Sequence, residues 1–91
     1  VSISPIDKGL HLSRYVKEII KEIQTSGYNY EVGAMGTTIE TPDLESLCNL
    51  VEKLEQKLFQ MGSKRVIINL KIDHRIDKST SIKYKKERVL E

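Results

Sequence analysis

A chain of 91 residues is long enough for one domain with a single hydrophobic core and too short for two. Apolar residues make up 38% and charged residues 31%, a balance that excludes a disordered chain and is typical of a globular domain. The 15 basic and 13 acidic residues leave a net charge of +2, which does not by itself indicate nucleic acid or an acidic membrane as a partner. We therefore expect one domain over residues 1–91.

The sequence shows no run of about 18 apolar residues and no basic leader before an apolar stretch, so neither a membrane span nor a secretory signal is expected. A cytoplasmic location is the resulting expectation. The single cysteine, Cys48, has no partner for an internal disulfide and falls on the apolar face of an expected helix. This placement predicts a buried thiol.

The first half of the chain predicts a strand, a helix and two more strands. Val1–Ser4 alternates apolar and polar residues, which is the pattern of a half-buried strand. A helix follows and ends at Gly27, because glycine readily takes the left-handed conformation that closes a helix. Its apolar stripe consists of Leu12, Val16, Ile19, Ile20 and Ile23. Tyr28–Val32 and the run around Ile39 predict two antiparallel strands, with a bulge or close backbone approach at Gly33 and Gly36.

The second half predicts a helix and a strand. Thr41-Pro42-Asp43 has the character of a helix start, with a hydroxyl cap at Thr41, a proline in the first helical position and an acid in the first turn. The stripe expected to be buried consists of Leu44, Leu47, Cys48, Val51, Leu54 and Leu58, and Gly62 ends the helix. Residues 65–73 alternate as a half-buried strand. The basic tail, which contains Lys83, Lys85, Lys86 and Arg88, allows a short further helix.

The expected order of strand, helix, strand, strand, helix, strand is that of an α+β, ferredoxin-like split βαβ fold. In this arrangement two helices cover one face of a four-stranded antiparallel sheet. The other face stays open and is available to a ligand or to another subunit.

No catalytic constellation is recognisable. His11 and His74 are far apart and have no ligand neighbours at metal-binding spacing, so we expect both at the surface and no metal site. The sequence contains no Gly-x-Ser-x-Gly motif and no glycine-rich phosphate loop with its lysine. We therefore expect a protein that is not an enzyme and needs no cofactor.

Glu40 is the most informative polar residue, since it ends a strand just before a helix. Two roles stay open: the carboxylate can stabilise a helix N-terminus, or it can accept paired hydrogen bonds from an aminopyrimidine-like ring. Thr37 and Thr38 face opposite sides of their strand, so one hydroxyl should reach the open face. Asp73 ends the last strand on its polar side, and Tyr30 is the aromatic residue best placed to border a pocket.

Several motifs together carry a resemblance to a known family. They are Met35-Gly36-Thr37, Ile39-Glu40, Arg65-Val66, Lys71-Ile72-Asp73 and Arg75-Ile76-Asp77-Lys78. With these motifs the sequence resembles the small thiamine-binding protein family of the YkoF-like superfamily. The resemblance implies a ferredoxin-like fold, assembly into dimers or tetramers, and binding of thiamine or its hydroxymethylpyrimidine part with no established reaction.

By the same resemblance Thr37, Glu40 and Asp73 are the expected ligand contacts, and Ser4 and Met35 line the same pocket. The expected function is a carrier, sensor or salvage protein for a thiamine-like molecule. An oligomeric structural or regulatory module with another ligand is the alternative. Nucleic-acid binding is disfavoured, because the open face of the last strand lacks the aromatic pair that such sheets use.

Overall fold

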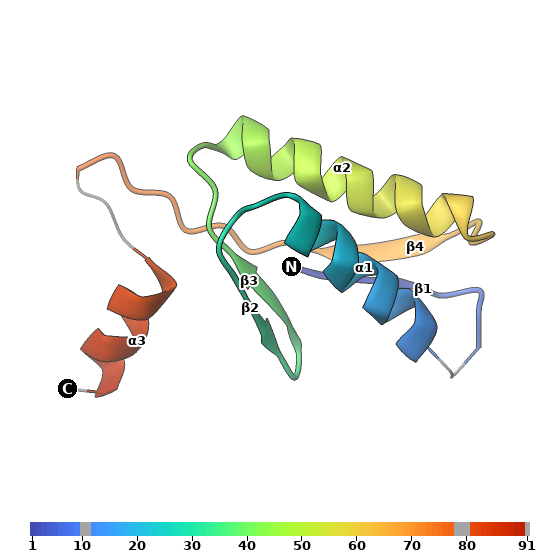
Figure 1. The fold of residues 1–91 in the computed structure, drawn as a ribbon, viewed down its shortest axis with the longest axis horizontal. Helices are drawn as coiled ribbons and strands as arrows, with labels where there is room; N and C mark the ends of the chain where they lie inside the picture. Colours follow the sequence, from blue (N-terminus) through green and yellow to red (C-terminus); the bar gives the residue numbers. More distant parts are fainter. Residues whose placement is uncertain (10–11, 78–80, 91) are drawn as a thin grey trace.

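A computed structural model describes residues 1–9, 12–77 and 81–90. Figure 1 shows the elements, which follow the expected order and add a third helix in the basic tail. They are β1 (Ser2–Pro5), α1 (Ser13–Thr25), β2 (Tyr30–Gly33), β3 (Gly36–Ile39), α2 (Leu44–Gln60), β4 (Val66–Asn69) and α3 (Ile82–Leu90). The α+β class and the short helix after β4 are therefore confirmed.

The four strands form two two-stranded antiparallel sheets, β1 with β4 and β2 with β3, instead of the single four-stranded sheet expected from the sequence. The two sheets meet at one reciprocal pair: the Thr37 amide donates to the Val1 carbonyl oxygen, and the Val1 nitrogen donates to the Thr37 carbonyl oxygen, each at 2.7 Å. In this register Ser2 lies beside Gly36, where β3 begins, so β1 and β3 overlap too briefly to form a longer ladder.

Gly36 permits the close approach of β1 to β3, as the glycine pattern predicted. Its φ is +154°, and a Cβ atom built there would lie 2.8 Å from the Val1 carbonyl oxygen. Gly33 lies opposite Gly36 across the two-residue turn of the hairpin, and its Cβ would lie 3.0 Å from the Gly36 carbonyl oxygen. Side chains at either position would push neighbouring backbone apart.

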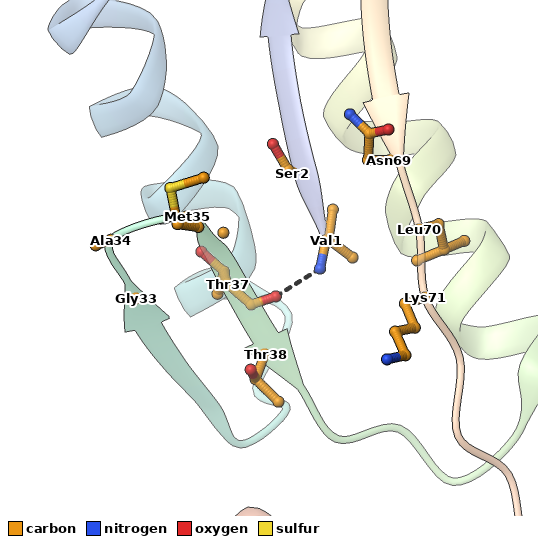
Figure 2. A pocket seen from close by; sticks show the side chains of 11 residues that line it. Val1, Ser2, Gly33, Ala34, Met35, Thr37, Thr38, Asn69, Leu70 and Lys71 are labelled. Atoms are coloured by element: carbon orange, nitrogen blue, oxygen red, sulfur yellow. Dashed lines mark hydrogen bonds between the residues drawn. The ribbon is translucent and has the colours of Figure 1, made fainter.

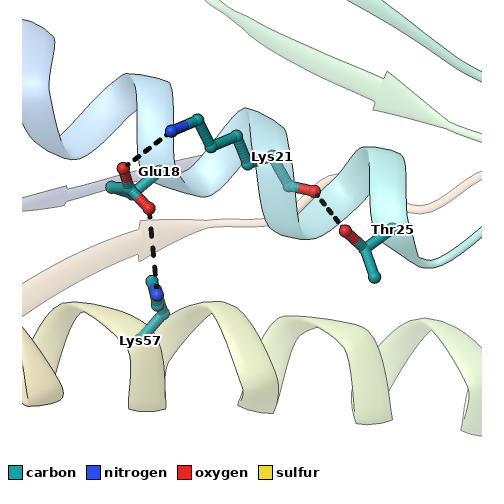
Figure 3. A network of polar contacts seen from close by, with 4 residues as sticks. All are labelled: Glu18, Lys21, Thr25 and Lys57. Carbon is teal, nitrogen blue, oxygen red and sulfur yellow. Dashed lines mark hydrogen bonds and ion pairs between the residues drawn. The ribbon is translucent and has the colours of Figure 1, made fainter.

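The core lies between the two long helices and the strands beneath them. It is formed by Ile19, Ile23, Leu50, Leu54 and Leu58, and Val1, Ile3, Ile39 and Val66 pack against it from the strands. At the helix surface, Glu18 accepts a contact from Lys21 at 3.2 Å and from Lys57 of α2 at 3.8 Å (Figure 3). Such partly exposed ion pairs add little stability, so apolar burial holds α1 on α2.

Four details of α2 correct the sequence prediction. The N-cap is Asp43, whose Oδ1 accepts a hydrogen bond from the Ser46 amide at 2.7 Å, and not Thr41. Cys48 is exposed and Leu44 is 46% exposed, whereas Leu50, which the predicted stripe omitted, is buried. Each helical residue turns by about 100°, so the face that carries Leu47, Leu50, Leu54 and Leu58 leaves Cys48 beside it and outside the core.

Two other expectations extended the buried regions too far. β4 ends at Asn69 and not at residue 73, because its partner β1 supplies only four paired residues, and Leu70 and Ile72 are accordingly exposed. Val16 of α1 is also largely exposed, at the margin of the helix pair.

Candidate functional site

Three carboxylates from three separate parts of the chain contact α3. Glu31 of β2 accepts a hydrogen bond from the Lys86 ammonium at 2.8 Å. Glu40, directly after β3, accepts one from the Ile82 amide at the start of α3, and Asp73, beyond β4, is paired with the Lys85 ammonium. We call Glu31, Glu40 and Asp73 the docking carboxylates.

Both oxygens of Glu40 are occupied by N–H donors. Oε1 accepts from the Ile82 amide, and Oε2 accepts from the Asn29 side-chain amide at 3.1 Å. The Glu40 backbone amide donates to the Asn29 carbonyl oxygen at 2.9 Å, which fixes the residue beside β2. The half-buried Glu40 carboxylate is thus held in place as a two-site acceptor.

Glu40 also stabilises a helix N-terminus, as one of its two predicted roles required, but the helix is α3 and not the adjacent α2. The first amides of a helix have no partner within the helix and attract negative charge. Glu40 satisfies the Ile82 amide, and the Ser81 hydroxyl accepts from the Tyr84 amide at 2.9 Å. A residue 42 positions earlier in the chain therefore completes the cap of α3.

Asp73 and Glu40 contact the same turn of α3, because their respective partners, Lys85 and Ile82, are three residues apart on that helix. The hydrogen bond and positive charge of Lys85 lower the pKa of Asp73 below its usual value, with smaller contributions from Arg75 and Lys71. Two of the predicted ligand residues thus converge, and the groups that they contact are an N–H donor and a cation of the protein itself.

Thr37 and Met35 belong to a different region, an open cleft of about 730 Å³ beside Val1. Figure 2 shows this cleft between the hairpin and the segment that follows β4, with Val1 between them. Thr37 is buried against the core side, and the exposed hydroxyl of this pair belongs to Thr38. Met35 is 91% exposed at the hairpin turn.

The five predicted contacts do not line one cavity. Ser4 lies opposite Ile67 in the β1–β4 sheet and borders neither the cleft nor the α3 contacts. Tyr30 is half-buried against the core, although it also borders a second cavity, of about 410 Å³, between β2 and α3. The roles of Ser4, Met35 and Thr37 as ligand contacts stay predictions.

The remaining polar motif is a local pair. Arg75 Nε donates to Asp77 Oδ1 at 2.9 Å and Nη2 donates to Oδ2 at 2.5 Å, and this bidentate contact raises the pKa of Arg75. Lys78 and His11 lie outside the described residues, and His74 is exposed. Within the described ranges, no three His, Cys, Asp or Glu side chains gather as a metal site.

Sequence reasoning missed Glu31, Asn29 and the lysines of α3 as parts of this region. The one available signal was the concentration of lysines in residues 83–86, which favours contact with acidic residues on the folded body. Nothing in the sequence indicated which acids these would be.

The comparisons with known proteins bear on this geometry. The family described as "Thiamine-binding protein" matches residues 1–90. The chain belongs to the thiamine-binding protein family. A UPF0045 protein of Methanothermobacter thermautotrophicus is 36% identical over 80 residues, which cover 88% of this chain and 81% of the relative. The UPF0045 protein MJ1052 of Methanocaldococcus jannaschii is 35% identical over 85 residues, covering 93% of this chain and 83% of the relative.

Solved structures agree with this membership. The crystal structure of the hypothetical protein MJ1052 from the same organism is similar with a TM-score of 0.86 and 33% identity, over 97% of this chain and 89% of that one. A domain of unknown function, DUF77, from Bacillus cereus is similar with a TM-score of 0.81 and 34% identity, over 92% and 80% of the two chains. The described helices include none with the length and apolar character needed to cross a membrane.

Proposed function

We propose that this protein binds thiamine, or a hydroxymethylpyrimidine-like molecule, without transforming it, and acts as a cytoplasmic carrier, sensor or salvage protein. Membership of the thiamine-binding protein family supports this class of ligand. The single observation in the structure that carries the proposal is that Glu40 is paired with two N–H donors while Asp73 is paired with a cation on the same turn of α3.

This pairing matches the chemistry of the ligand. A protonated aminopyrimidine presents an amino N–H and a ring N–H side by side, and a carboxylate accepts both in a charge-assisted pair. The neighbouring carboxylate of Asp73 complements the positively charged thiazolium ring. Thr37, Met35 and Ser4, which the family resemblance also implies, share no cavity with these two acids, so the proposal rests on Glu40 and Asp73. The chemistry requires no cofactor.

The proposal extends to assembly. β1 and β3 already share the Val1–Thr37 pair, so we propose that the four strands act as one ferredoxin-like sheet in a dimer or tetramer. Ile67, 46% exposed on the face away from the helices, supports contact with a second subunit. It equally favours the second candidate function, an oligomeric structural or regulatory module with another ligand. Sedimentation together with thiamine titration separates the two, since the second candidate predicts assembly without thiamine binding.

Isothermal calorimetry with thiamine at neutral pH tests the binding proposal. Glu40→Gln keeps one oxygen that can accept the Ile82 amide, but it removes the charge and the second acceptor. We expect thiamine affinity to fall by about tenfold to a hundredfold, as for the loss of a charged hydrogen-bond partner. Glu52→Gln, on the exposed face of α2, is the matched control and should bind as the wild type does. Absence of heat with millimolar thiamine would rule out the proposal.

A further inference from the structure

The first turn of α3 offers the docking carboxylates the same kinds of group that the proposed ligand would. The Ile82 amide gives Glu40 an N–H donor, as an aminopyrimidine edge does. On the same turn, the Lys85 ammonium gives Asp73 a positive charge, as a thiazolium ring does. The helix therefore satisfies the two acids that the proposed function assigns to ligand binding.

The contacts between α3 and the docking carboxylates are polar and mostly exposed. No residue of α3 is buried. The Lys86–Glu31 and Lys85–Asp73 pairs join side chains that are each about half exposed or more, which makes them weak and sensitive to salt. A cavity of about 410 Å³ separates part of the helix from β2, so the two surfaces are incompletely packed. Figure 1 likewise shows α3 set apart from the α1–α2 layer.

From these observations we propose that α3 is a displaceable internal substitute for the ligand. When α3 is docked, as in this structure, it contacts the carboxylates of Glu40 and Asp73. Thiamine binding requires the helix to move away from both carboxylates. This inference rests on the proposed function, because it assumes that the same two acids bind thiamine.

Competition has a thermodynamic consequence that can be measured. If only the undocked form binds, the apparent dissociation constant is the intrinsic one divided by the undocked fraction. Any change that weakens docking without touching Glu40 or Asp73 must then tighten thiamine binding. Lys86 offers such a change, since its partner is Glu31 of β2.

The experiment compares Lys86→Gln with Lys83→Gln in the full chain. Both remove one positive charge from α3, but among the residues that the structure describes Lys83 pairs with Glu87 of the same helix, at 4.0 Å, and not with an acid of the sheets. By calorimetry, thiamine should bind Lys86→Gln about twofold to fivefold more tightly than the wild type, the effect of one exposed ion pair. Lys83→Gln should match the wild type. Hydrogen exchange should show the Ile82 amide losing protection when thiamine is added to the wild type.

The outcomes distinguish the two proposals. If thiamine binds the wild type while Ile82 keeps its protection, or if both lysine variants bind thiamine equally well, α3 does not compete and this inference is wrong, whereas the proposed function stands. If thiamine binds neither the wild type nor Lys86→Gln, the proposed function is wrong and the inference falls with it.

Discussion

Gly36→Ala should separate the hairpin from β1 and so test how the two sheets are joined. Gly36 has a φ of +154°, in a region that is almost exclusive to glycine and costs other residues about 1–3 kcal/mol. The added Cβ would also lie 2.8 Å from the Val1 carbonyl oxygen, which accepts the Thr37 amide. Moving Val1 away weakens both hydrogen bonds of the Val1–Thr37 pair, each worth about 0.5–1.5 kcal/mol.

Together these effects predict that Gly36→Ala lowers the free energy of unfolding by about 2–6 kcal/mol, a large share of the stability of a small domain. Urea denaturation followed by far-UV circular dichroism measures the loss. Gly27→Ala is the matched control: its φ is +81°, but nothing lies within 4 Å of an added Cβ, so only a backbone cost of about 1–2 kcal/mol is expected.

Hydrogen exchange gives a second, local measurement of the same change. The Thr37 amide should exchange faster in Gly36→Ala than in Gly27→Ala, because only the first substitution displaces its acceptor. Equal losses of stability in the two variants, together with an unchanged Thr37 exchange rate, would show that contact at Gly36 does not join β1 to β3.

The remaining predictions concern the core, a loop contact and the cysteine. Leu54→Ala should lower the free energy of unfolding by about 2–5 kcal/mol because the side chain is fully buried, whereas Leu44→Ala at an exposed position should cost far less; similar urea midpoints would contradict the assigned core. Asp7 accepts hydrogen bonds from the Lys64 amide at 2.8 Å and the Ser63 hydroxyl at 2.7 Å, which lower its pKa. The ionised Asp7 should therefore stabilise the fold at neutral pH, and this contribution should disappear as the pH falls below about 3.8 and through the lowered pKa of the folded state. A stability difference between wild type and Asp7→Asn that persists at such low pH would refute this linkage. Cys48 should react with a thiol reagent in the folded protein at a rate close to that of the unfolded chain, and reaction only upon unfolding would show a buried thiol.

The candidate site links these stability questions to binding. Glu40 follows β3, the hairpin strand that contacts Val1, and its backbone amide donates a hydrogen bond to the carbonyl oxygen of Asn29, just before β2. The orientation of its carboxylate therefore depends on the hairpin being held against the rest of the fold. On the proposed function, Gly36→Ala should consequently weaken thiamine binding as well as stability, although Gly36 has no side chain that could contact the ligand.

The sequence by itself determined the order of the elements and most of the core. Periodic apolar residues such as Ile19, Ile23, Leu54 and Leu58 are buried as predicted, because helical spacing is a local property that any 11-residue window reveals. The close backbone approach at the hairpin glycines was also predictable, because the conformational freedom of glycine is a local property too. The combined motifs were enough to indicate the family.

Only the tertiary structure decided what the polar residues contact. Glu40, Asp73 and Glu31 meet partners that are 42, 12 and 55 positions away, and the lysines of α3 are chemically equivalent until folding assigns each a neighbour. The length of β4 was likewise set by its partner β1 and not by its own alternating pattern. Patterns along a chain report which side of an element is apolar, whereas pairing between distant residues depends on how the elements are placed in space.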